Sequence, residues 1–354
     1  MSYKFHPFEV AFSGNSGTGK TTLIEKLVKN FSQKYSIAYI KSDVHGFMMD
    51  KEGKDTFRIY KAGAQSVYIS DFKHRAYISK KKLNNDLFKE ELLLYDIVLI
   101  EGYKEEKIYK YLFSDKKDSK LLFKDDERLL GIIKSDKNIF LENKVFHRDD
   151  IDAIKSDLEL SLLKRKPKLN ALILVGGKSS RMGTDKALIK YGNKTQVKIL
   201  AELLSSYVEN VFVSVNENQY DSDSYKEFNL IKDRIEGIGP IGGLLSAFIN
   251  DNKSAYLVVA CDMPLIDDEV IVNLIKNRDF LKFGTFYEND YSFEPLIAIY
   301  EPKIFNFLLK SLIKKSYSIK KNIKDLPLNL IKNKYKGKFK NINTLTDKER
   351  LMIF

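Results

Sequence analysis

The sequence predicts two α/β units, each with a mostly parallel sheet. An apolar strand runs into a glycine-rich turn and then a helix at two separate places, residues 8–28 and 169–186. Alternating strand and helix patterns follow both places, which is typical of parallel sheets covered by helices. A chain of 354 residues is also long for one domain, so two domains are the first expectation.

Each half of the chain contains further strand candidates. In the first half they are SIAYIKSD, SVYISD and YDIVLIEGY, and in the second VENVFVSVN, FNLIKD and SAYLVVACD. Between the halves, residues 149–163 have helical periodicity, which ends in the charged run KRKPK at 164–168. We therefore expect domains at 1–165 and 166–354. Because the halves share no repeated sequence, we interpret them as two different domains.

Composition narrows the class of protein. Hydrophobic residues make up 44% and charged residues 31%, an ordinary balance for a globular protein with a buried core. No apolar run approaches the ~18 residues of a membrane span. The N-terminus MSYKFHPFEV lacks the apolar segment of a signal peptide, so a cytoplasmic location is expected. Cys261 is the sole cysteine, which excludes an internal disulfide and, with four histidines, a Cys/His zinc cluster.

The formal net charge is +12, from 60 Lys and Arg against 48 Asp and Glu. The lysines are spread along the chain with short runs at 80–82 and 164–168, without an arginine-rich arm or a basic stripe interleaved with aromatics. This pattern favours solvated lysine faces over a nucleic-acid or membrane partner. A basic surface would also attract anionic nucleotides.

The first glycine-rich turn is an intact P-loop. Gly14, Gly19, Lys20 and Thr21 satisfy G-x-x-x-x-G-K-[ST] between a predicted strand and a predicted helix. The glycines let backbone N–H groups curl around phosphate oxygens, and the helix N-terminus adds its positive end. Lys20 should reach the β- and γ-phosphates, and the Thr21 hydroxyl should ligate Mg²⁺. A tight turn that binds nothing is the less favoured alternative.

An acidic residue follows a buried strand farther along. YDIVLIEGYK places Glu101 after four apolar residues, where a carboxylate can hold the Mg²⁺ shell or orient a water. The alternative is a strand-end glutamate that faces solvent. The residues expected to bind nucleotide in this domain are Gly14, Gly17, Gly19, Lys20, Thr21, Thr22 and Glu101, with Thr21 and Glu101 as metal ligands.

The first half resembles the molybdenum-cofactor accessory protein B family (MobB), which are GTP-binding P-loop proteins. The resemblance rests on GNSGTGKTTL, IKSDVHGFMMDKEGKDTFRIYKAGA and DIVLIEGYK, and it covers most of residues 5–115. It implies a P-loop NTPase-like fold that binds GTP. The sequence departs from the family after Lys41, where His45 alone remains of a His-rich segment, and at Glu52, which replaces a proline. A role carried by those histidines is therefore not implied here.

The second glycine-rich turn, GGKSSRMGTDK at 176–186, is not a P-loop. Gly177-Lys178-Ser179 looks like the end of one, but the earlier glycine would fall at Leu172. We therefore assign no catalytic role to Lys178 or Ser179.

This turn suits nucleotidyl transfer, in which an acceptor phosphate attacks the α-phosphorus of a nucleoside triphosphate and pyrophosphate leaves. Backbone N–H groups, Lys, Arg and Mg²⁺ supply most of such catalysis. Gly176 and Gly177 allow close backbone approach, and Arg181 and Lys186 are placed to meet phosphate charge.

Three polar residues follow other predicted strands of the second half. Asp262 ends a buried run and can bind Mg²⁺, Asp233 precedes a glycine-rich turn, and Asn216 ends VFVSVN. Taken singly, each aspartate is slightly better explained as a cap or turn residue. Taken with residues 176–186, they favour a nucleotide site.

The second half resembles the molybdenum cofactor guanylyltransferase family (MobA). The resemblance rests on LVGGKSSRMGTDKALIKYG, SVN, KDRIEGIGPIGGLLSA, VVACDMPLI, FEPLIAIY and NINTLTD, which occur in the family's order across residues 170–348. It implies a Rossmann-like nucleotidyltransferase fold, a three-layer α/β/α unit, and an enzyme whose substrates are GTP and molybdopterin. It assigns GTP binding to Leu174, Gly176, Gly177, Lys186, Asn216 and Asp233, Mg²⁺ binding to Asp262, and molybdopterin binding to Asn341 and Asn343.

Guanine is favoured over cytosine as the base that is transferred. Related cytidylyltransferases have Ala in place of Gly176 and lack a segment like Gly-Pro-Ile-Gly-Gly at 239–243. Val175 replaces the usual alanine of the family, which adds a branch and removes no functional group.

The leading hypothesis is a fusion of a GTP-binding accessory domain and a transferase that makes the guanine dinucleotide cofactor. One alternative is transfer to another phosphorylated acceptor such as a sugar phosphate, or cytidylyl transfer to molybdopterin. Another is a GTP-binding carrier that delivers cofactor, with molybdoenzyme apo-proteins and their chaperones as partners. The sequence is compatible with an oligomer.

Overall fold

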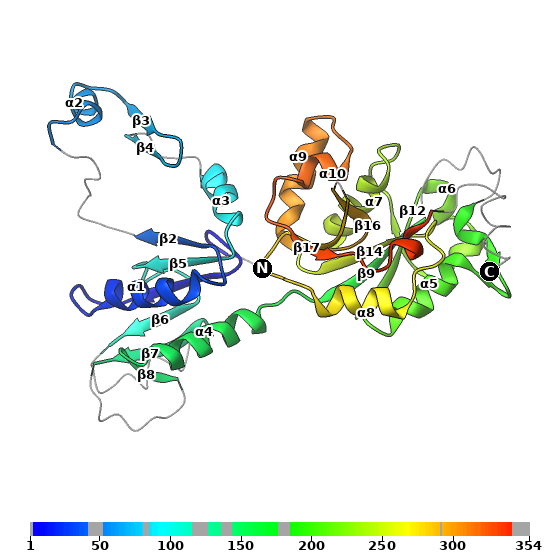
Figure 1. The fold of residues 1–354 in the computed structure, drawn as a ribbon, viewed down its shortest axis with the longest axis horizontal. Coiled ribbons are helices and arrows are strands. Elements are labelled where there is room, and N and C mark those ends of the chain that lie inside the picture. Colours follow the sequence, from blue (N-terminus) through cyan, green and yellow to red (C-terminus); the bar gives the residue numbers. More distant parts are fainter. Residues whose placement is uncertain are drawn as a thin grey trace. The chain divides into compact units, whose positions relative to one another are not determined.

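The computed structural model describes residues 3–41, 52–80, 85–114, 127–135, 144–175, 185–290 and 292–341. The chain divides into two compact units, Met1–Arg165 and Lys166–Phe354 (Figure 1). Each unit has its own sheet and its own buried core.

The first unit is built on a six-stranded parallel sheet with the order β2-β5-β1-β6-β7-β8. Its strands are β1 (Glu9–Ser13), β2 (Ile37–Lys41), β5 (Ile97–Glu101), β6 (Lys110–Phe113), β7 (Leu129–Lys134) and β8 (Val145–His147). The central strands β1 and β5 are buried along their whole length, as in parallel sheets covered on both faces. The helices that accompany the sheet are α1 (Lys20–Phe31), α3 (Asn85–Leu93) and α4 (Ile151–Lys164), and α1 packs against α4.

A small substructure lies outside this sheet. α2 (Asp55–Lys61) packs on β3 (Ser66–Ser70), which pairs antiparallel with β4 (Arg75–Ser79). The sequence correctly predicts a strand at SVYISD, but its place in the parallel pattern is wrong. The turn between β3 and β4 is too short for the crossover of a dozen or more residues that parallel pairing needs, so the two strands form a hairpin.

The second unit is built on a seven-stranded sheet with the order β13-β12-β9-β14-β16-β15-β17. Its strands are β9 (Leu169–Leu174), β12 (Val211–Val215), β13 (Asn229–Lys232), β14 (Ala255–Ala260), β15 (Gly284–Asn289), β16 (Ser292–Tyr300) and β17 (Asn329–Lys332). The first four in the order are mutually parallel, and β16 runs antiparallel to both of its neighbours. The short strands β10 (Lys190–Tyr191) and β11 (Lys194–Thr195) form a separate ribbon.

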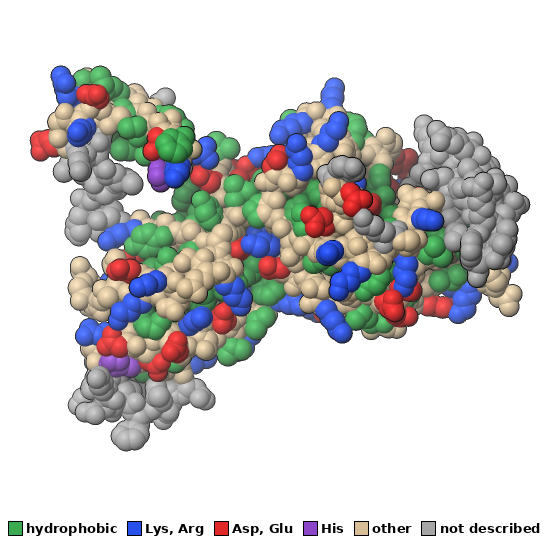
Figure 2. All heavy atoms as spheres, in the orientation of Figure 1, with side chains coloured by type: hydrophobic (Ala, Val, Ile, Leu, Met, Phe, Trp, Pro, Cys, Tyr) green, Lys and Arg blue, Asp and Glu red, His purple; other side chains and the backbone are tan. Residues whose placement is uncertain are grey.

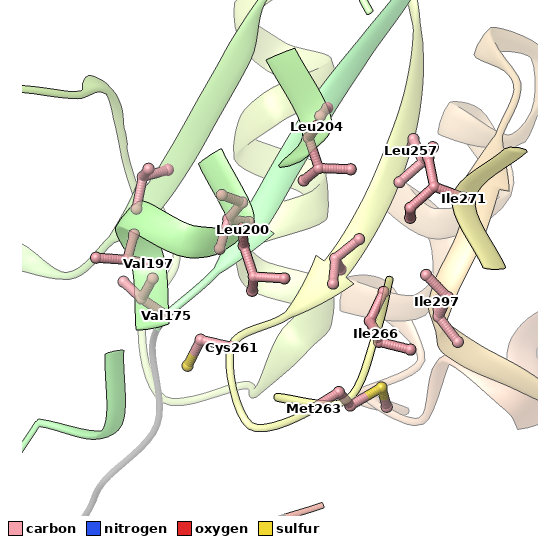
Figure 3. Close-up of a cluster of buried hydrophobic side chains, with 14 of the residues drawn as sticks. Val175, Val197, Leu200, Leu204, Leu257, Cys261, Met263, Ile266, Ile271 and Ile297 are labelled. Carbon is pink, nitrogen blue, oxygen red and sulfur yellow. The ribbon is translucent and has the colours of Figure 1, made fainter. Parts of the chain in front are cut away.

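Helices cover both faces of this sheet. They are α5 (Gln196–Ser205), α6 (Glu217–Tyr220), α7 (Pro240–Asn250), α8 (Asp268–Lys276), α9 (Phe305–Ile313) and α10 (Ile319–Ile323), with 3₁₀ turns η2 (Lys186–Leu188), η3 (Asp223–Tyr225), η4 (Pro302–Ile304) and η5 (Lys336–Phe339). On β9, Ile173 belongs to the same buried cluster as Leu200 of α5, which Figure 3 labels, whereas Leu174 lies against Gly243 of α7. Because neighbouring strand residues point to opposite faces, α5 and α7 lie on opposite sides. The predicted three-layer α/β/α unit is confirmed.

The surface carries charges of both signs. On the face seen in Figure 2, Lys and Arg side chains are interspersed with Asp and Glu. Within the described ranges, none of the helices combines the length and the apolar character that a membrane crossing needs.

Candidate functional site

The first glycine-rich turn joins β1 to α1, as the P-loop pattern predicts. Gly14 has a φ of 148°, and a Cβ there would lie 2.7 Å from Phe113 Cβ and 2.9 Å from its carbonyl oxygen. Glycine is therefore required for the loop to pass this close to β6. Gly17 and Gly19 also have positive φ, at 76° and 90°, and Gly19 is the N-cap of α1. The loop ends at the N-terminus of a 12-residue helix, where anions bind favourably.

Lys20 folds back over this loop. Its Nζ donates to the Asn15 carbonyl at 2.6 Å and lies 3.5 Å from Thr18 Oγ1. The Thr18 hydroxyl donates to the same carbonyl at 2.9 Å, which braces the turn. The lysine is 8% exposed, so its ammonium is held above the loop, where it is placed to meet phosphate charge.

The two predicted metal ligands of the first unit lie in contact. The Thr21 hydroxyl is 2.8 Å from Glu101 Oε2 and 3.0 Å from Oε1. Glu101 ends β5, the neighbour of β1, and is buried, so it does not face solvent. The Tyr39 hydroxyl donates to Oε2 at 2.7 Å, and Lys41 Nζ lies 3.8 Å from Oε1. Hydroxyl and carboxylate oxygens side by side are the donors that Mg²⁺ prefers.

A cation here would depend on phosphate and water for its remaining ligands. No group of three or more His, Cys, Asp and Glu side chains that could hold a metal occurs in the part of the chain that the structure describes. Mg²⁺ sites of nucleotide-binding proteins commonly use one or two protein ligands together with phosphates. Thr22 is exposed on the first turn of α1, and His45 lies outside the described residues.

In the second unit, the predicted residues follow four adjacent parallel strands. Asp233 follows β13, Asn216 follows β12, Leu174 ends β9, and Asp262 comes shortly after β14. The carboxyl ends of parallel strands meet at one edge of a sheet, so these residues gather there. The Cys261 N–H donates to the Leu174 carbonyl at 3.1 Å, which joins two of these strand ends.

Asp262 carries an unpaired carboxylate oxygen. Its Oδ1 is buried and has no hydrogen-bond partner among the described residues. Burial raises the pKa of the carboxyl group, and the positive charge of Lys186 opposes that rise. Figure 3 shows the neighbouring Cys261 and Met263 within an apolar cluster, which anchors the strand end. A buried carboxylate oxygen without a hydrogen-bond partner is chemically suited to a divalent cation.

Asp233 has a different environment. The Ser214 hydroxyl donates to its Oδ1 at 2.6 Å. Burial raises the pKa of Asp233 to about 6, and the Ser214 hydrogen bond works in the other direction. The carboxylate is therefore held in place by a neighbouring strand.

A polar network joins Asn216 to the turn that carries Lys186. Asn216 and Gln219 form a capping box at α6, with bonds of 3.0 and 3.1 Å between each side chain and the other backbone N–H. Gln219 Nε2 donates to Asp185 Oδ2 at 2.7 Å, and the Tyr225 hydroxyl donates to the same oxygen at 2.7 Å. Asp185 also caps η2, which begins at Lys186.

Sequence reasoning missed Asp185, Gln219 and Tyr225. Asp185 directly precedes Lys186 in GTDK, which is a local signal of a cap. Tyr225 contacts it from 40 positions away and has no local signal.

Four predicted site residues are not described: Gly176, Gly177, Arg181 and Asn343. Asn341 is described, and it is exposed just beyond η5. The assignments of all five to substrate remain predictions.

The Gly-Pro-Ile-Gly-Gly segment has a packing role that the sequence did not indicate. A Cβ at Gly243 would lie 2.8 Å from Leu174 Cδ2 and closer still to Ser214 Oγ. The first turns of α7 can therefore approach β9 and β12 only because this residue is glycine.

Each unit contains a match to a known family model. Residues 10–135 match the family model of Molybdopterin guanine dinucleotide synthesis protein B (MobB), and residues 171–324 match the MobA-like NTP transferase domain.

Three relatives extend the comparison. A probable molybdenum cofactor guanylyltransferase of Clostridium perfringens is 35% identical over 52% of this chain and 96% of its own length. The molybdopterin-guanine dinucleotide biosynthesis adapter protein of Haemophilus influenzae is 34% identical over 35% of this chain and 72% of its own. A molybdenum cofactor biosynthesis bifunctional protein of Synechocystis is 34% identical over 40% of this chain, and the match spans 42% of that relative.

Both resemblances inferred from the sequence motifs are confirmed by these matches. The chain belongs to the MobB family in its first unit and, in its second, to the molybdenum cofactor guanylyltransferases, which are nucleotidyltransferases of molybdenum cofactor biosynthesis.

Proposed function

We propose that this chain transfers GMP from GTP to molybdopterin, with or without bound molybdenum, and so forms molybdopterin guanine dinucleotide and pyrophosphate. The observation that carries the proposal is the gathering of Leu174, Asn216, Asp233 and Asp262 at the carboxyl edge of four adjacent parallel strands. That edge is where α/β sheets bind nucleotides.

The terminal phosphate of molybdopterin attacks the α-phosphorus of GTP, and the bond to pyrophosphate breaks. Lys186 and Arg181 stabilise the charge that develops on phosphoryl oxygens and on pyrophosphate. The backbone of Gly176 and Gly177 approaches the triphosphate next to Leu174. Asp185 precedes Lys186 and accepts a hydrogen bond from Gln219, which is bonded in turn to Asn216. These bonds hold Lys186 in a fixed position relative to Asn216, a proposed contact to the nucleoside.

Asp233 and Asn216 read the nucleoside. An ionised Asp233 accepts from the N–H groups of guanine, while Ser214 holds the carboxylate from the other side. Asn341 and Asn343 are the proposed contacts to molybdopterin.

Asp262 is the proposed Mg²⁺ ligand, since its buried Oδ1 otherwise has no partner among the described residues. When bound, the cation would neutralise charge on the triphosphate and on the leaving pyrophosphate.

The first unit is proposed to bind GTP at its P-loop. Gly14, Gly17 and Gly19 shape the loop, Lys20 meets the β- and γ-phosphates, and Thr22 continues the phosphate-binding turn. Thr21 and Glu101 would hold Mg²⁺, as their contact supports. A second candidate function for the first unit is a GTP-dependent carrier that delivers cofactor to molybdoenzyme apo-proteins and their chaperones.

A substrate screen tests the proposal. Purified full-length protein is incubated with molybdopterin, Mg²⁺ and one nucleoside triphosphate at a time, and dinucleotide and pyrophosphate are quantified. We expect product with GTP. Preferential use of CTP, or transfer to a sugar phosphate in place of molybdopterin, would identify the alternative transferase. Absence of product even in a single turnover would leave the carrier function alone.

A further inference from the structure

A small pocket adjoins the P-loop of the first unit. Its volume is about 230 Å³, and it is lined by Gly19, Thr22, Leu23, Lys26, Arg148 and Asp149. Four of these residues come from the end of the phosphate loop and the first turns of α1, and two come from the turn between β8 and α4. The nucleotide-binding residues assigned above do not account for Lys26, Arg148 or Asp149.

The sheet topology explains why these two segments meet. β8 is parallel to β7, and every strand from β1 to β8 in this sheet runs in the same direction. The turn after β8 therefore lies at the same edge as the P-loop that follows β1. Gly19 belongs both to the phosphate loop and to the pocket lining, so the pocket is continuous with the phosphate site.

Asp149 is held at this pocket as an ionised acceptor. Lys26 Nζ lies 3.3 Å from its Oδ1, and this hydrogen bond is the main cause that keeps the pKa of Asp149 below its usual range. A carboxylate has about four acceptor positions, so one lysine does not exhaust them.

The backbone of the same turn is fixed by His147. His147 Nε2 lies 3.1 Å from the Ser135 carbonyl, and Nδ1 lies 3.3 Å from the Asp149 N–H. The ring thereby joins the end of β7 to the turn that carries Asp149.

We propose that this pocket holds the guanine base of the nucleotide at the P-loop, with the Asp149 carboxylate accepting hydrogen bonds from N1–H and the 2-amino group. The inference rests on the proposed binding of GTP by the first unit, and it adds the residue that selects the base. An acceptor-only carboxylate matches the two donors on this edge of guanine, whereas adenine presents an acceptor at N1.

The size and lining of the pocket suit a base. Its volume is below the roughly 300–1,000 Å³ of sites for drug-sized ligands, which fits one ring system better than a whole nucleotide. Leu23 supplies apolar contact, and the planar guanidinium of Arg148 can lie against a base face.

Base exchange tests this assignment on the full-length chain. Binding of GTP, XTP and ATP is measured by calorimetry in wild type, in Lys20→Ala, in Asp149→Asn and in Asp152→Asn. Lys20→Ala identifies the binding component that belongs to the first unit. Asp152→Asn is the matched control, because Asp152 is exposed in the first turn of α4 and is not part of the pocket lining.

In the Lys20-dependent component, Asp149→Asn should weaken GTP binding about tenfold to a hundredfold. It should strengthen XTP binding by a similar factor, because the asparagine amide can donate to the 2-oxo group of xanthine where a carboxylate cannot. The control should change neither affinity. A loss of folding alone cannot produce the gain for XTP.

Two other outcomes separate the inference from the function on which it rests. If Lys20→Ala removes no GTP-binding component, the proposed GTP site of the first unit is wrong. If that component exists but Asp149→Asn leaves the ratio of GTP to XTP affinity unchanged, the GTP site stands and the assignment of Asp149 is overturned.

Discussion

Asp262 and Asp233 lie at the same sheet edge, and their surroundings give them different properties. Asp262 has a buried oxygen with no hydrogen-bond partner among the described residues, whereas Ser214 donates to Asp233. The pKa of each carboxyl group is raised chiefly by burial, and for Asp262 the charge of Lys186 limits the rise. Asp262 is therefore suited to a cation and Asp233 to a hydrogen-bond donor on the substrate.

Asp262→Asn should lower the rate of dinucleotide synthesis steeply while leaving GTP binding at the P-loop unchanged. Loss of a group that stabilises transition-state charge costs roughly 10²–10³ in rate. Initial rates of product formation measure the loss, and calorimetry measures the P-loop component. Asp325→Asn, at an exposed position, is the control and should keep full activity. Turnover close to wild type in Asp262→Asn would contradict the metal role.

Asp233→Asn should make the second unit more stable at pH 8 and change it little at pH 4.5. The folded state holds the Asp233 proton up to about pH 6, whereas an unfolded aspartate loses it near pH 4. The stabilising effect of that proton is therefore lost as pH rises from about 4 through about 6. After allowance for partial exposure, the difference at pH 8 is on the order of 1–2 kcal/mol.

Urea unfolding of wild type and variant at the two pH values provides the measurement. If wild type and variant differ by the same free energy of unfolding at both pH values, Asp233 does not titrate between them. The ionised form is also the one proposed to accept from guanine, so kcat/KM for GTP should rise through about pH 6 in wild type.

Tyr225→Phe should lower kcat and leave the KM for molybdopterin unchanged. The substitution removes a donor to Asp185, whose cap positions Lys186, so we expect a loss of roughly tenfold in kcat, equivalent to one hydrogen bond to a charged group. Tyr256→Phe is the matched control, because that hydroxyl also donates inside the core, to Ala247 and Asp251, away from the site. If Tyr225→Phe and Tyr256→Phe lower kcat equally, Tyr225 has a structural role only.

At the scale of secondary structure, strand–turn–helix steps place both sites. The apolar runs before Gly14 and before Gly176 form β1 and β9, and the residues expected at the ends of β5, β12, β13 and β14 occur at or just beyond those ends. Local pattern is enough for this, because a buried parallel strand is a short apolar run and its polar end marks the sheet edge. Pairing direction is different: SVYISD has the same local pattern but forms a hairpin with β4.

Gly243→Ala should destabilise the second unit by about 1–3 kcal/mol, since the added methyl group collides with Leu174 and Ser214 and pushes α7 away from the sheet. Chemical unfolding monitors the loss. Gly337→Ala serves as the control, because a Cβ there meets nothing within 4 Å and the effect should stay within about 0.5 kcal/mol. Equal stability of the two variants would contradict the close approach of α7.

At the scale of the whole molecule, the chain changes units within a few residues. The Arg165 guanidinium donates to the carbonyls of Pro7 and Glu9 in the first unit. The Pro167 carbonyl accepts from Arg278, which forms a buried ion pair with Glu301 in the second unit. Each side of Lys166 is thus anchored to a different core, and we propose that residues 1–165 and 166–354 are independent domains.

Separate expression of residues 1–165 and 166–354 should therefore yield two folded fragments. The first should bind GTP with the affinity of the Lys20-dependent component, and the second should retain dinucleotide synthesis. Cooperative thermal unfolding and the two assays provide the readouts. Aggregation of either fragment, or loss of synthesis that is restored on mixing, would show that the units depend on each other.

The sequence by itself determined the α/β class, the two glycine-rich turns, the strand ends that carry Glu101, Asn216, Asp233 and Asp262, and both family assignments. These follow from contiguous residues, because motif spacing and hydrophobic runs are local properties.

The tertiary structure decided which groups share a site and what their surroundings do to them. The contact between Thr21 and Glu101, the bond from Tyr225 to Asp185 and the meeting of Lys26 with Asp149 join residues 80, 40 and 123 positions apart. The burial that raises the pKa of Asp233 likewise depends on the packing of whole elements. Such effects arise from through-space contact and desolvation, which sequence separation does not reveal.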